Sequence, residues 1–177
     1  MYSPLQGLTL VAATSLVWMV GAMLIGFRAV RWSDETLVDD GFLMRIRAWE
    51  RTLHFYRGLV HIQCWKDSVP EFGDFFKGGV SKRSLRNGSP DTLVRFVFET
   101  RRAERCHWRI VAFGLTFPLW TDWWFALINL ALAAVINLPF IAIQRYNRIR
   151  LERALVRSGA SHRIPGNDDG HTIWAIG

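Results

Sequence analysis

Two long stretches of this chain carry almost no charge. Residues 1–27 contain no Lys, Arg, Asp or Glu, and residues 110–143 contain only Asp122. All 22 Lys and Arg residues lie in 28–109 and 144–163, within a chain of 177 residues and net charge +7. Disordered chains, secreted disulfide scaffolds and simple soluble domains do not show this block pattern. The sequence therefore predicts a small integral membrane protein.

The first uncharged stretch is long enough to cross a bilayer as a helix. Leu5–Phe27 comprises 23 residues, which extend about 35 Å as an α-helix and cover a hydrocarbon core of about 30 Å. A cleavable signal peptide would begin with basic residues and have a shorter apolar run. Here Arg28 and Arg31 follow the run and no Lys or Arg precedes it. We predict an uncleaved signal-anchor helix over 5–27, with the N-terminus outside the cell.

The second uncharged stretch is divided by Pro118. Residues 110–120 would extend only about 16 Å as a helix, too short to cross alone, and the proline breaks or kinks them. Three tryptophans surround Asp122, as at a membrane–water interface, and the 19 residues 125–143 can cross. The segment 110–120 ends a second transmembrane helix or forms a re-entrant half-helix. Either alternative gives a multi-pass protein of the cell membrane with a C-terminal helical hairpin and a cytoplasmic C-terminus.

The region between these stretches, residues 32–108, is expected to be cytoplasmic or interfacial. Apolar residues recur at roughly helical spacing from Asp34 to Arg57, which predicts an amphipathic helix lying on the membrane or on other helices. Several glycines and prolines between positions 70 and 90 predict a loop.

A further helix is expected to begin at Asp91, which is a suitable N-cap, and to run into the charged block at 99–109. The tail over 158–177 contains Gly, Asp and His, and we expect it to be flexible. Together these features predict an all-α integral membrane protein, with residues 1–177 forming a single membrane domain.

The charged block holds the densest group of reactive side chains. On a helix, Glu99, Glu104 and His107 share one side, opposite the four arginines of the block. Glu104 precedes His107 by three residues, so its carboxylate can contact the imidazole, fix the tautomer and leave the other ring nitrogen as a base. The alternative is an interfacial helix whose ion pairs are structural.

A basic segment follows the last apolar stretch. It contains Arg145, Asn147 and Arg148, and arginine forks at this place could bind a phosphate or a carboxylate. Anchoring to anionic lipid explains the arginines equally well.

Other candidate sites carry weaker signals. Trp65 and Lys66, with Lys82 beside two glycines, could bind an anion, although the pattern is more typical of an interfacial loop. We expect no metal site, because the ligand spacing of the possible zinc ligands is poor; these are His61, Cys64, Cys106 and His107. We also expect no nucleic acid partner, since membrane orientation accounts for the basic excess.

Two motifs resemble those of a known family. Glu99-Thr100-Arg101-Arg102-Ala103-Glu104 with His107-Trp108, and Asn137-Leu138-Pro139 with Gln144-Arg145-Tyr146-Asn147-Arg148, resemble the motifs of the glycosyl-4,4′-diaponeurosporenoate acyltransferase family. Trp65-Lys66 resembles a third, looser motif. The polar residues that match are Trp65, Lys66, Glu99, Arg101, Glu104, His107, Arg145, Asn147 and Arg148.

This resemblance implies a membrane acyltransferase of staphyloxanthin-type carotenoid synthesis, which esterifies a sugar hydroxyl of a glycosylated carotenoid or related glycolipid. We expect His107 with Glu104 and Glu99 to be catalytic. We expect the substrates to be bound by Arg145, Arg148, Asn147, Arg101, Trp65, Lys66 and Lys82.

We expect no cofactor; acyl-CoA or an acyl carrier protein would be the co-substrate and a thioester the acyl donor. Other enzymes of the pathway are possible partners. The alternative function is a non-catalytic lipid-binding or scaffold protein, whose charged helices would be docking faces.

Overall fold

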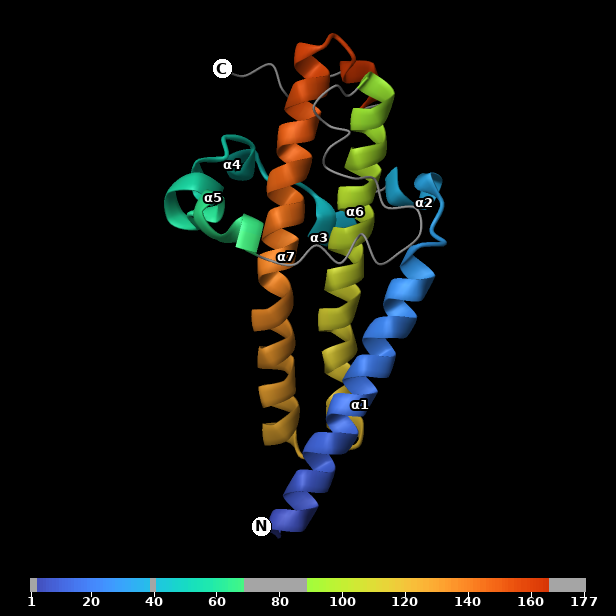
Figure 1. The fold of residues 1–177 in the computed structure, drawn as a ribbon, viewed down its shortest axis with the longest axis vertical. Coiled ribbons are helices and arrows are strands. Elements are labelled where there is room, and N and C mark those ends of the chain that lie inside the picture. The colour runs from blue at the N-terminus through green and yellow to red at the C-terminus, as the bar shows by residue number, and fades with distance from the viewer. Residues whose placement is uncertain (1–2, 39–40, 69–88, 166–177) are drawn as a thin grey trace.

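The computed structural model describes residues 3–38, 41–68 and 89–165. Three long helices dominate it (Figure 1): α1 (Pro4–Ala29), α6 (Pro90–Phe113) and α7 (Trp123–Arg157). Short helices fill the upper half of the molecule, beside the hairpin of α6 and α7; they are α2 (Asp34–Val38), α3 (Gly41–Met44), α4 (Ala48–Arg51), a π-helical turn (Phe55–Leu59) and α5 (Ile62–Trp65). The described residues contain no strand, in agreement with the expected all-α class.

Helix α1 begins at a complete capping box. Ser3 Oγ accepts a hydrogen bond from Gln6 N, the Gln6 side chain accepts one from Ser3 N, and Pro4 occupies the first helical position. Most of its apolar side chains are exposed, and only Thr14 and Ala29 are buried. Helices α1 and α7 are both long and apolar enough to cross a membrane. These lengths and compositions favour membrane association.

Helix α1 packs against the lower end of the hairpin through Trp18. The Trp18 ring stacks on Phe117 and meets the edge of Phe113, and its Nε1 donates to Asn129 Oδ1 at 3.0 Å. Gly21 lies against the Phe113 ring, and a Cβ at this position would overlap Phe113 Cε1, so the ring would have to move. The partly buried Trp18–Asn129 hydrogen bond fixes the register of α1 on α6 and α7.

The second uncharged stretch extends the charged helix instead of standing alone. Helix α6 continues to Phe113 and passes directly into a 3₁₀ segment, Gly114–Leu119, which contains Pro118. The chain turns at Trp120–Asp122, and α7 then runs back alongside α6 (Figure 1). The C-terminal helical hairpin is therefore present, and it includes residues 90–157. The side of a membrane that each end faces stays a prediction.

The predicted amphipathic helix over Asp34–Arg57 is wrong, because this segment is divided into short helices. Gly41 and Leu53 adopt positive φ angles of 37° and 61°, which interrupt a right-handed helix. Guanidinium groups of α6 and α7 bind carbonyls that a continuous helix would use internally; these belong to Leu37, Val38, Leu43, Met44 and Arg51. Long-range hydrogen bonds thus replace local ones.

The tail over 158–177 was predicted to be flexible, but its first residues pack against the hairpin. Ala160 and Ile164 are buried and pack with Val97 of α6 and Leu155 of α7. Residues 166–177, the remainder of that prediction, lie outside the described residues.

Candidate functional site

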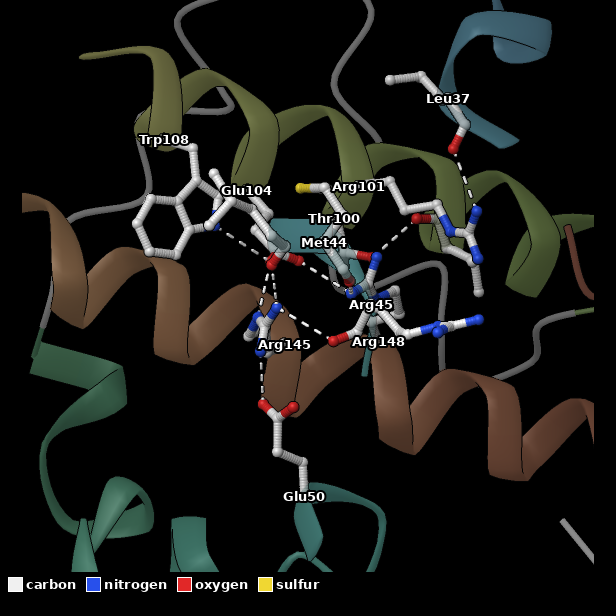
Figure 2. Close-up of polar contacts among 12 residues, drawn as sticks. Leu37, Met44, Arg45, Glu50, Thr100, Arg101, Glu104, Trp108, Arg145 and Arg148 are labelled. Carbon is white, nitrogen blue, oxygen red and sulfur yellow. Dashed lines mark hydrogen bonds and ion pairs between the residues drawn. The ribbon is translucent and has the colours of Figure 1, made fainter. Parts of the chain in front are cut away.

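The site is built around the carboxylate of Glu104, which is fully buried between α6 and α7 (Figure 2). Its Oε1 accepts from Arg145 Nε at 2.7 Å and from Trp108 Nε1 at 3.4 Å, and its Oε2 lies 3.1 Å from Arg148 Nη2. Burial raises the pKa of the Glu104 carboxyl, and the two guanidinium groups oppose that shift. The carboxylate therefore joins α6 to α7 through a charge-assisted hydrogen bond from Arg145 and an ion pair with Arg148.

A second carboxylate, Glu50, shares Arg145 with Glu104. Arg145 Nη1 donates to Glu50 Oε1 at 2.7 Å, and Tyr56 OH donates to the same oxygen at 2.6 Å. Glu50 Oε2 accepts from the backbone N–H of Arg47 at 2.7 Å. Burial, followed by the hydrogen bond to Glu50, raises the pKa of Tyr56. Arg145 thus connects the short helix α4 to the hairpin.

A third charged pair, farther along the hairpin, is structural. Arg101 Nη2 lies 3.8 Å from Glu152 Oε1, and both side chains are nearly inaccessible to solvent. Arg101 also donates to the carbonyls of Leu37, Val38 and Pro165. Arg101 therefore holds α2 and the segment after α7 against α6, and its predicted substrate contact stays a prediction.

An aromatic cavity of about 490 Å³ adjoins the Arg145–Glu50 pair. Its walls are apolar and come from α4, the π-helical turn, α5, α6 and α7; they include Trp49, Phe55, Trp65, Trp108, Val135, Leu138 and Pro139. Glu50, Tyr56 and Arg145 are the polar groups of its lining. Val135 and Leu138 are 69% and 47% exposed, so one wall is continuous with the apolar outer surface of α7. The cavity can hold an apolar chain next to a cation and a carboxylate.

The predicted contact between Glu104 and His107 is wrong. His107 Nδ1 lies 2.8 Å from Asn137 Oδ1, and the imidazole stacks on Phe140 with ring centroids 4.8 Å apart. Asn137 Nδ2 donates to the carbonyl of Ala133, so its Oδ1 is the acceptor for His107. The i,i+3 spacing permits a Glu104–His107 contact, but the arginines of α7 are stronger partners for a buried carboxylate.

The described partners of His107 are Asn137 and Phe140, and they do not include the arginines that were expected to act with it. Asn137 precedes Arg145 by eight residues, which correspond to about 12 Å along a helix. Arg148 is fully buried, and besides Glu104 it contacts the carbonyl of Met44. Arg148 therefore already has two protein partners, and an active centre that combines His107 with Arg145 and Arg148 stays a prediction.

The remaining predicted residues have mixed outcomes. Trp65 lines the cavity, whereas Lys66 pairs with its neighbour Asp67 at 2.5 Å. Glu99 pairs with Arg102 and lies outside the group around Glu104. Asn147 follows Arg145 by two residues, so its side chain projects from another side of α7. The last candidate, Lys82, lies outside the described residues.

Neither cysteine is in a disulfide, and the described part of the chain contains no group of three or more His, Cys, Asp or Glu that could hold a metal ion.

The sequence did not predict Glu50 and Tyr56 as site residues. Glu50 is 95 residues from Arg145 in the sequence, and the spacing of residues within one helix cannot predict a contact over that separation.

Comparisons with known proteins place this site within a family. A family model described as glycosyl-4,4′-diaponeurosporenoate acyltransferase matches residues 40–157, which include every residue that lines the cavity. Proteins of that name from Staphylococcus aureus strains Newman and COL are each 25% identical over 154 residues, covering 84% of this chain and 91% of each relative. No solved structure matches. The chain belongs to the glycosyl-4,4′-diaponeurosporenoate acyltransferase family.

Proposed function

We propose that this protein is a membrane-bound acyltransferase that esterifies a sugar hydroxyl of a glycosylated carotenoid, or a related glycolipid, with a fatty acyl group. The observation that supports this proposal is the aromatic cavity, which is lined in part by the Arg145–Glu50 pair and lies within the segment matched by the family. An apolar chain bound along its walls would place a reacting carbonyl near a cation and a carboxylate.

Lipid-soluble substrates would reach the cavity from the bilayer. The exposed apolar faces of α1 and α7 support two membrane-crossing helices. If the end of α6 with Gly114–Leu119 makes a third crossing between them, the N-terminus lies outside and the C-terminus in the cytoplasm. Val135 and Leu138 would then face lipid at the cavity mouth, and Trp49, which is 55% exposed, would lie at the interface. The short helices near Trp49 would rest on the membrane surface, beside an acyl donor delivered from the cytoplasm.

The transfer would be a direct displacement at a thioester, with acyl-CoA or an acyl carrier protein as donor. The sugar oxygen forms a bond to the acyl carbon, and its proton passes to the Glu50 carboxylate. The carbon–sulfur bond breaks, and the departing thiolate takes the proton from Glu50, which regenerates the carboxylate and releases a thiol.

Arg145 would stabilise the oxyanion that forms on the carbonyl. Four of its five N–H groups have acceptors in the described structure, and the second N–H of Nη1 could serve the oxyanion. The same guanidinium keeps the Glu50 carboxylate in place. Glu104, which also accepts a hydrogen bond from Trp108, holds Arg145 from the opposite side, which fixes the position of Arg145 before substrate binds.

The test measures ester formation in membranes that contain Glu50→Gln, with Glu35→Gln as a matched control on the exposed surface of α2. Gln preserves the shape of the side chain, but its single oxygen can accept the hydrogen bond from Tyr56 or the one from Arg47 N and not both, and it cannot take a proton. We expect the rate to fall by about 10²-fold or more in the first variant and to stay within twofold of wild type in the second.

His107→Gln distinguishes the cavity from a centre at His107. If His107→Gln abolishes ester formation while Glu50→Gln retains it, the cavity is not the catalytic centre. If neither substitution changes the rate of any acyl transfer, the protein is a lipid-binding or scaffold protein.

A further inference from the structure

A second cavity lies at the end of α1, where the chain leaves the apolar helix. It measures about 480 Å³ and is lined by Leu24, Phe27, Arg28, Arg31 and Trp32. Leu24 and Phe27 are 58% and 56% exposed, so one half of the cavity is open and apolar. The upper part of α1 diverges from α6 and α7 in Figure 1, and the cavity lies at the end of this diverging part.

Arg28 and Arg31 line the other half of the cavity, and a third guanidinium group, that of Arg109, lies over the ring of the lining residue Trp32. The Arg31 guanidinium lies 3.7 Å from the centroid of the Phe27 ring, and Arg109 of α6 lies 4.1 Å from the centroid of the Trp32 ring. Arg28 is on the cavity wall itself. These aromatic contacts orient the cations without neutralising them.

The charge of this group is uncompensated in the described structure. Among the residues it describes, no carboxylate forms an ion pair with Arg28, Arg31 or Arg109, although Asp34 is close enough to pair with the neighbouring Arg102 at 3.4 Å. Three cations beside an apolar surface form a site that matches an anion attached to a hydrocarbon chain.

We propose that this cavity binds the phosphate headgroup of an anionic phospholipid. Arg28 and Arg31 would donate to the phosphate oxygens, Arg109 would add charge from α6, and an acyl chain would lie along Leu24 and Phe27. Arginine forks suit phosphate geometry, and the position at the end of an apolar helix matches the depth of a headgroup. This site is separate from the cavity at Arg145 and does not depend on acyl transfer.

The test is native mass spectrometry of the detergent-purified full chain, with phosphatidylglycerol and phosphatidylcholine of identical acyl chains as probes. Arg28→Gln with Arg31→Gln removes the two lining cations, and Arg109→Gln alters the site without touching α1. Arg95→Gln is the control, because Arg95 is an exposed arginine of α6 outside this cavity. Circular dichroism checks that each variant keeps its helices.

We expect wild type and Arg95→Gln to bind phosphatidylglycerol in preference to phosphatidylcholine. The double variant should lose that preference by roughly tenfold or more, since each arginine near a lipid surface contributes severalfold. Arg109→Gln should lose part of it. An unchanged preference in the double variant would overturn the proposal, as would displacement of the lipid by millimolar inorganic phosphate, which would indicate a site for a soluble phosphate.

Discussion

Replacing the buried carboxylate of Glu104 by an amide tests whether the charged network holds the hairpin together. Glu104→Gln keeps the size of the side chain but leaves Arg145 with one carboxylate and removes the carboxylate that contacts Arg148. Breaking a buried pair by removing one partner costs about 3–5 kcal/mol, because an uncompensated charge stays buried. For a chain of this size, that loss corresponds to a decrease in Tm of about 6–20 °C.

The assay is thermal unfolding of the detergent-solubilised protein, followed by tryptophan fluorescence. Glu99→Gln is the matched control, because the Glu99–Arg102 pair is partly exposed and should contribute less than about 1 kcal/mol. In the double variant Glu104→Gln with Arg148→Met, both charges of the pair are removed together. Its loss of unfolding free energy should therefore be smaller than the sum of the losses in the two single variants. Equal effects of Glu104→Gln and Glu99→Gln on Tm would refute the reasoning.

Two further predictions concern a thiol and a glycine. Burial raises the pKa of the Cys106 thiol to about 11, whereas Cys64 is exposed. At pH 8 a maleimide should therefore modify Cys106→Ser protein, which keeps Cys64, much faster than Cys64→Ser protein, which keeps Cys106. Comparable rates of modification, measured by mass spectrometry, would contradict the burial of Cys106. Gly21→Ala should lower Tm because its new Cβ would overlap the Phe113 ring. Gly7→Ala is the control and should not lower Tm, because the space around Gly7 is open. Equal Tm values for the two variants would contradict the packing of α1 on α6.

The hydrophobic pattern was sufficient to predict the long helices. The uncharged length of 5–27 matches α1, and the turn near Asp122 and the return helix follow from the second stretch. Charge blocks and apolar length are properties of contiguous sequence, which explains why they are reliable. The Asn137 and Arg145 motifs lie on α7, within the segment that the family model matches.

The local structure between α1 and α6 could not be predicted in this way. Apolar periodicity indicated one helix over 34–57, but arginines from distant helices bind its carbonyls and divide it. Helical spacing likewise placed Glu104 beside His107, although both residues have partners on α7. Such choices depend on long-range packing, which the spacing of one helix does not encode.

The central claim is that the acyl chain binds in the cavity beside Arg145, and photo-crosslinking tests it most directly. A fatty acyl thioester with a diazirine close to its carbonyl would be irradiated with the full-length protein in membranes, and the labelled residues identified by tandem mass spectrometry. We predict adducts on cavity residues such as Trp65, Trp108 and Leu138. Labelling confined to His107 and Phe140, with none in the cavity, would contradict the account.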